Sequence, residues 1–187
     1  MKMVEATTQN WLKTAHDIIV NQRICNAYVI PDTGIVIVAK AGVVDEQLCY
    51  DMGYKVYEAF NIGMGTIVAN AGDVEIGHFG KPEDGWRDRY VTALIEWLQS
   101  KGLNVTNEGN DILVDGYKVA STCVTRYNEI EYTGGHIGIN TKLEDIKKIC
   151  TKPMVKVPKG LSEYGITTEK VKDWFLDFCG KDEENLQ

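Results

Sequence analysis

Hydrophobic and polar residues are arranged along the chain in patterns that predict both helices and strands. Apolar residues that recur every three to four positions predict amphipathic helices. Short apolar runs, or runs in which apolar and polar residues alternate, predict strands. The expected helices are residues 7–21, 45–52, 84–101, 142–150 and 167–179. The expected strands are residues 27–30, 34–40, 55–60, 65–72, 103–106, 111–116, 117–127 and 134–140.

The order of these elements predicts the fold class. Strands occur in groups and do not alternate strictly with helices, which indicates an α+β fold with mixed, mostly antiparallel sheets flanked by helices. No repeat, linker or low-complexity block interrupts the pattern. We therefore expect one domain over residues 1–187, with no separate accessory domain and a disordered tail from about residue 181 to 187.

The pair Asp115-Gly116 is typical of a two-residue hairpin turn, and it places Lys118 on a strand just past that turn. A lysine on a rigid strand can hold a positive charge against a phosphate or a carbonyl oxygen. The alternative is that Lys118 is a solvated side chain beside a turn. The pattern alone leaves both interpretations open.

Composition and charge exclude several classes of protein. The chain is 44% hydrophobic and 25% charged, as in folded globular proteins. A net charge of −7 argues against a nucleic-acid partner, which requires a basic surface. No apolar run approaches the roughly 18 residues of a membrane span, and the start does not resemble a signal peptide. Five scattered cysteines without CxxC spacing indicate reduced thiols, and we expect a cytoplasmic protein.

The three histidines, His16, His78 and His136, lack the spacing of metal ligands, so we expect no protein-held metal site. His136 lies in an expected strand beside the region of Lys118, where we expect it to be a polar lining group. The stripe of Trp86, Tyr90, Leu94 and Trp97 is expected to belong to the core.

Several segments together resemble the lipoate–protein ligase and octanoyltransferase superfamily. The stretch GNDILVDGYKVASTC (109–123) resembles the family motif in which an Asn-Asp pair precedes a hairpin and a Gly-x-Lys strand. Upstream, GMGTIVANAGD (63–73) resembles the family's glycine-rich strand. Downstream, GGHIGIN (134–140) and KVPKGLSEYGIT (156–167) resemble two further family segments. The resemblance covers roughly residues 10–175 in a shared order.

This resemblance implies a biotin/lipoate-ligase-like catalytic domain that transfers lipoate or octanoate to a lysine of a lipoyl-type carrier domain. It implies ATP and magnesium as cofactors if the protein is a ligase, and an acyl-adenylate as the activated species. Lys118 is then the central residue, in contact with the acyl carbonyl and phosphate. The residues implied to face the ligand are Gly63, Gly65, Asn70, Asn110, Asp111 and Gly135.

The sequence also departs from the family pattern. Phe60 and Asn61 occupy the positions of two arginines of the ligases, and Ala69-Asn70 replaces a His-Asp pair. Arginine is hard to replace at a phosphate site because of its fork of donors. The alternative is therefore a non-catalytic binding module for an acyl or biotin-like ligand or for a carrier protein. A relative of the biotin ligases is a third hypothesis.

The resemblance also raises thiol chemistry, because octanoyltransferases pass the acyl group through a cysteine. Cys123 follows Lys118 on the same expected strand, and Cys150, at the end of the short helix, is the nearer match to the family nucleophile. A nucleophilic thiolate needs a lowered pKa, and a helix C-terminus works against that. Cys150 is thus a possible nucleophile or an incidental cysteine.

Overall fold

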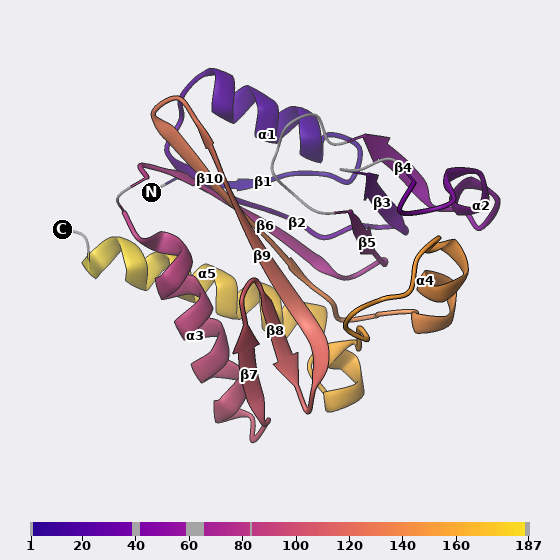
Figure 1. Cartoon of the computed structure of the whole chain (residues 1–187). Coiled ribbons are helices and arrows are strands. Elements are labelled where there is room, and N and C mark those ends of the chain that lie inside the picture. Colours follow the sequence, from indigo (N-terminus) through magenta and orange to yellow (C-terminus); the bar gives the residue numbers. More distant parts are fainter. Residues whose placement is uncertain (1, 39–41, 59–65, 83, 186–187) are drawn as a thin grey trace.

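The computed structural model describes residues 2–38, 42–58, 66–82 and 84–185, and it contains two sheets with helices around them (Figure 1). The larger sheet has seven strands in the order β1-β2-β6-β10-β9-β8-β7. Its strands are β1 (Lys2–Glu5), β2 (Cys25–Val29), β6 (Val74–Gly80), β7 (Val105–Glu108), β8 (Asp111–Val114), β9 (Tyr117–Tyr127) and β10 (Ile130–Ile137). The smaller sheet has three strands, β3 (Ile35–Val38), β4 (Lys55–Glu58) and β5 (Ile67–Ala69).

Strand pairing is mixed but mostly antiparallel. In the larger sheet only β1 and β2 are parallel, and in the smaller sheet β3 is parallel to β4 and antiparallel to β5. The predicted α+β fold class is therefore confirmed. The turn at residues 31–34 does not form a hairpin, because it leads from β2 in one sheet to β3 in the other.

Helices cover the two faces of the larger sheet. Those of the chain are α1 (Trp11–Val20), α2 (Glu46–Asp51), α3 (Trp86–Ser100), α4 (Leu143–Ile149) and α5 (Thr168–Asn185), with the 3-10 helix η1 (Leu161–Tyr164) before α5. The buried stripe of Trp86, Tyr90, Leu94 and Leu98 on α3 packs with Phe175 of α5 in one core, as the periodicity predicts. On the other face, α1 packs with strands of both sheets in a second core (Figure 1). Residues of α2, α4 and the smaller sheet form a third.

Several elements differ from the sequence prediction. The strands β1 and β6 were not predicted, since β1 has only four residues and β6 buries Glu75 and His78, polar residues that hide its apolar pattern. Helix α1 begins at Trp11 and not near residue 7.

Helix α5 continues past the predicted end at residue 179 as far as Asn185. The cause is a tertiary contact, because Asp182 is buried and accepts hydrogen bonds from Arg89 of α3, one of them at 3.1 Å from Nη2. In the part of the chain that the structure describes, none of the helices has the length and apolar character needed to cross a membrane.

Candidate functional site

The hairpin of β8 and β9 positions Lys118. Asp115 and Gly116 both adopt positive φ, 52° and 81°, as a tight two-residue turn requires, so the predicted hairpin is confirmed. A bulge at Ile112/Leu113 shifts the register of the two strands. Lys118 also pairs with the segment before η1, where its backbone N–H donates to the carbonyl of Val157 at 2.9 Å. Its backbone is thus held from two sides.

The side chain of Lys118 lines two neighbouring cavities of about 320 and 220 Å³. The larger one is enclosed by residues of both sheets and by the segment after α4. Its walls include Val44, Ile67, Val68, Ile146, Cys150, Met154 and Pro158. Lys118 therefore faces a cleft lined in part by the described end of the glycine-rich segment, as predicted, and not bulk solvent.

Asp111 fixes the ammonium group of Lys118. The distance from Lys118 Nζ to Asp111 Oδ1 is 2.8 Å, and Lys156 Nζ lies 3.1 Å from Asp111 Oδ2. Burial alone would raise the pKa of Asp111, but its hydrogen bonds and charge contacts with the two lysines outweigh burial and lower it. Asp111 thus stays ionised, and both cavities contain a fixed positive charge at their shared wall.

His136 lies beside this wall, between the two buried carboxylates of Asp73 and Glu75. His136 also lines both cavities and contacts the carboxylate of Glu75 through Nδ1, while its Nε2 lies 3.9 Å from Asp73 Oδ2. Burial works against protonation of His136, but the charge and hydrogen bond of Glu75 and the charge of Asp73 outweigh it, and its pKa is raised. The expectation that His136 is a polar lining group is confirmed.

Asp73 anchors the end of β10 to the turn before β6. Its carboxylate accepts hydrogen bonds from the backbone N–H groups of Ile139 at 2.7 Å, Asn140 at 2.8 Å and Asn70 at 2.8 Å. Gly72 of the same turn has a φ of +86°, and a Cβ atom there would lie 2.4 Å from Asn140 Nδ2. The positive φ and the close approach of Asn140 both disfavour a residue with a Cβ atom, which is the physical reason for glycine at this position.

Two hydroxyl groups near Lys118 have no hydrogen-bond partner among the residues that the structure describes. The buried oxygens are Thr66 Oγ1 and Thr122 Oγ1, and both residues line the smaller cavity. A buried hydroxyl without a partner costs free energy, on the order of 1–3 kcal/mol. This arrangement therefore suits a ligand that offers polar groups to the cavity.

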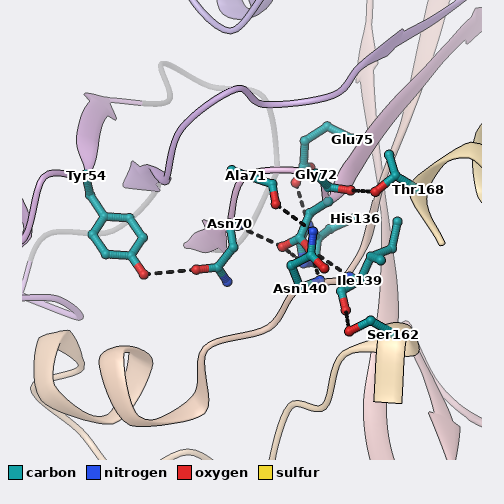
Figure 2. Close-up of polar contacts among 11 residues, drawn as sticks. Tyr54, Asn70, Ala71, Gly72, Glu75, His136, Ile139, Asn140, Ser162 and Thr168 are labelled. Atoms are coloured by element: carbon teal, nitrogen blue, oxygen red, sulfur yellow. Dashed lines mark hydrogen bonds and ion pairs between the residues drawn. The ribbon is translucent and has the colours of Figure 1, made fainter. Parts of the chain in front are cut away.

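The structure brings together three of the four predicted ligand-facing residues that it describes. Asn110, Asp111 and Gly135 line the smaller cavity with Lys118. Asn70 does not join them, since it lines a separate cavity of about 240 Å³ and accepts a hydrogen bond from the Tyr54 hydroxyl at 3.0 Å (Figure 2). Gly63 and Gly65, like Phe60 and Asn61, lie outside the described residues.

The two candidate thiols both reach the cavities but are poorly suited to attack. Cys150 lines the larger cavity and Cys123 the smaller one. Burial raises the pKa of Cys150, and burial raises that of Cys123 to about 11. Both thiols are therefore protonated near neutral pH, which disfavours the thiolate that a nucleophile needs.

Sequence reasoning missed several residues at the site. Lys156, Ser121 and Thr122 line the cavities, and Asp73 and Glu75 support His136 from behind. In the sequence, Asp73 and Glu75 alternate with apolar residues. This pattern is typical of a strand with one polar face and could have pointed to these two residues. Across residues 2–38, 42–58, 66–82 and 84–185, no group of three or more His, Cys, Asp or Glu side chains is arranged to hold a metal ion.

Solved structures with a similar fold include lipoate ligases and biotin ligases. P. falciparum LipL1, in complex with lipoate, has a TM-score of 0.81 at 16% identity, and the match covers 99% of this chain and 63% of LipL1. The chain thus spans less than two thirds of that protein. A bipartite lipoate protein ligase of Thermoplasma acidophilum has a TM-score of 0.79 at 11% identity, covering 98% of this chain and 83% of that one.

Lipoate-protein ligase A bound with ATP has a TM-score of 0.77 at 12% identity, with 98% of this chain and 85% of that one covered. At these identities the likeness shows the fold. No curated protein sequence is recognisably similar to the chain. Residues 41–177, however, match the family described as "Lipoyl protein ligase A/B catalytic domain". This match spans most of the chain, including both cavities beside Lys118, and the chain therefore belongs to the lipoyl protein ligase A/B catalytic domain family.

Proposed function

We propose that the protein binds a lipoate- or octanoate-type acyl group in the cavities beside Lys118 and transfers it to a lysine of a lipoyl-type carrier domain. The observation that carries this proposal is the ammonium group of Lys118, held by Asp111 where the two cavities meet. Support comes from the family match and from a neighbour of the same fold in complex with lipoate.

The two cavities suit different parts of such a ligand. The walls of the larger cavity are rich in aliphatic residues, including Val44, Ile67, Val68 and Ile146, which suit an acyl chain. The smaller cavity offers Asn110 and the unpaired hydroxyls of Thr66 and Thr122, which suit polar groups of an activated acid. ATP, with magnesium on its phosphates, would supply the activation. A neighbour of the same fold is bound with ATP.

Lys118 is the residue that would act on the reacting group. When an amine attacks an acyl carbonyl, negative charge develops on the carbonyl oxygen, and a fixed ammonium stabilises that charge. Asp111 keeps the Lys118 side chain from rotating away, since it contacts Lys156 at the same time. We also propose that the protein is cytoplasmic.

A second candidate function is binding without turnover. Phe60 and Asn61 stand where ligases of the family have two arginines, one of which helps to hold the ligand, so the charge-assisted contacts of that arginine are missing. Each such contact is worth about 1.5–3 kcal/mol. The same cavities would then hold an acyl or biotin-like ligand for a partner protein.

The substitution Lys118→Ala tests the proposed function. We expect acyl transfer or lipoate affinity to fall about 100-fold or more, because one donor to a developing oxyanion is removed. The free energy of unfolding should change by less than about 1 kcal/mol, since Asp111 keeps its contact with Lys156. Lys13→Ala, on the exposed face of α1, is the control. Unchanged transfer and unchanged lipoate affinity in Lys118→Ala would rule the proposal out.

An ATP–pyrophosphate exchange assay with lipoate distinguishes the two candidates. We expect the exchange to be slow, because Phe60 and Asn61 cannot make the contacts of arginine. Phe60→Arg and Asn61→Arg, made together, should raise the exchange rate if adenylation is the missing step. Exchange as fast in the native chain as in a family ligase would show that the arginines are dispensable here.

A further inference from the structure

A basic segment borders the larger cavity. Residues 146–162 contain five lysines and neither Asp nor Glu, although the chain has a net charge of −7. The lysines are Lys147, Lys148, Lys152, Lys156 and Lys159. The same segment forms one wall of the cavity through Ile146, Cys150, Met154, Val155, Lys156 and Pro158. Positive charge is therefore concentrated at one wall of the site on an otherwise acidic molecule.

Three of these lysines play little part in stabilising the fold. Lys147, Lys148 and Lys152 are exposed, and none of them lines the cavities. Lys147 contacts only Glu144, which is itself exposed, and no ion-pair partner of Lys148 or Lys152 is found in the part of the chain that the structure describes. Exposed charges of this kind contribute little to stability but act on an approaching partner.

Apolar side chains are exposed at the same rim. Val155 lines the cavity and is nevertheless 97% exposed, and Val157, two residues later, is also exposed. Val157 lies beside Lys118, since its carbonyl accepts the backbone hydrogen bond of Lys118. An apolar centre with charged residues around it is the composition of a protein–protein interface. A ligand inside the cavity would leave the outward faces of these residues uncovered.

We propose that this surface, the lysine rim (Lys147, Lys148, Lys152, Val155 and Val157), docks an acidic carrier domain that presents its acceptor side chain to Lys118. The inference rests on the proposed function and adds where and by what forces the carrier binds. The positive rim attracts an acidic domain that the rest of this acidic chain repels. Val155 and Val157 provide the apolar contact once the partner has arrived.

The test is a charge reversal that leaves the cavities intact. The rim variant carries Lys147→Glu, Lys148→Glu and Lys152→Glu. The matched control carries Lys2→Glu, Lys13→Glu and Lys81→Glu, which are equally exposed and change the net charge by the same amount. In the sheet, Lys2 is paired with Cys25, and Cys25 is paired with Phe79 near the end of β6. Lys81 directly follows that end of β6, whereas Glu75 lies at the other end. The probes are free lipoate and an acidic lipoyl domain with its acceptor lysine.

We expect the rim variant to lose at least about tenfold in affinity for the lipoyl domain, mainly through a slower association rate. The loss should shrink as the salt concentration rises, because salt screens exposed charges. The affinity of the rim variant for free lipoate, and that of the control for the lipoyl domain, should stay within about twofold of the native values.

Other outcomes overturn the inference and separate it from the proposed function. Native-like affinity of the rim variant for the lipoyl domain would show that the carrier docks elsewhere, while lipoate binding would leave the proposed function standing. Equal losses in both variants would show a general effect of net charge. Rim-dependent capture by vesicles of anionic lipid, with no affinity for the lipoyl domain, would assign the rim to a membrane surface. Failure of the native chain to bind lipoate and the lipoyl domain would overturn both proposals.

Discussion

At the scale of single residues, the buried His78 and the partly buried His136 have pKa values that their surroundings shift in opposite directions. His136 lies between two carboxylates, and these outweigh burial and raise its pKa. His78 is stacked on Trp86 and bonded to Asn26 and Asp84, and burial outweighs the contact with Asp84 and lowers its pKa. We expect His136 to titrate at a higher pH than His78 in an NMR titration. The reverse order would contradict the contacts of His136 with Glu75 and Asp73.

The raised pKa of His136 also predicts how stability depends on pH. The folded state holds this proton more tightly than the unfolded state, whose imidazole titrates near 6.5. The contribution of His136 to stability is therefore complete below about pH 6.5 and is lost as the pH rises through the raised value. Chemical denaturation at several pH values should show this loss in the native chain and its absence in His136→Gln. His16→Gln, on the surface, should retain it.

At the scale of elements, the turn of the β8–β9 hairpin sets the place of Lys118. Gly116 has a φ of +81°, where an L side chain is strained, so Gly116→Ala should lower the free energy of unfolding by about 1–2 kcal/mol. Gly180 lies in α5, and a Cβ atom there would meet nothing within 4 Å. Gly180→Ala should instead raise stability by about 0.5–1 kcal/mol. Thermal unfolding of the two variants gives the comparison, and equal effects would show that backbone conformation is not the cause.

Elements that depend on local chemistry could be predicted from the sequence, and those that depend on distant partners could not. The Asp115-Gly116 turn and the apolar stripe of α3 are local, and both appear as expected. Strand β6 was missed because Glu75 is a buried polar residue, and its partner His136 lies 61 residues later. The position of Asn70 away from Lys118 depends likewise on the three-dimensional path of the turn before β6.

At the scale of the whole molecule, the end of α5 fastens to α3. Asp182 is 5% exposed, and its carboxylate is paired with Arg89, a residue about one third exposed. Asp182→Ala should lower the free energy of unfolding by about 1–3 kcal/mol, because it removes one partner of a largely buried pair. Removal of residues 181–187 should have at least this effect. Lys181→Ala breaks an exposed pair with Asp177 and should cost no more than about 0.5 kcal/mol.

The walls of the larger cavity come from residues as far apart as Val43 and Pro158. Neither sheet encloses this space alone, so the unfolded chain offers a ligand nothing comparable to bind. A ligand at 100 times its dissociation constant would therefore add about 2.7 kcal/mol to the folding equilibrium. Proteases in the cell act on the unfolded fraction, and a gain of this size lowers that fraction about 100-fold. The lifetime of the protein should therefore lengthen when its ligand is abundant and shorten when it is scarce.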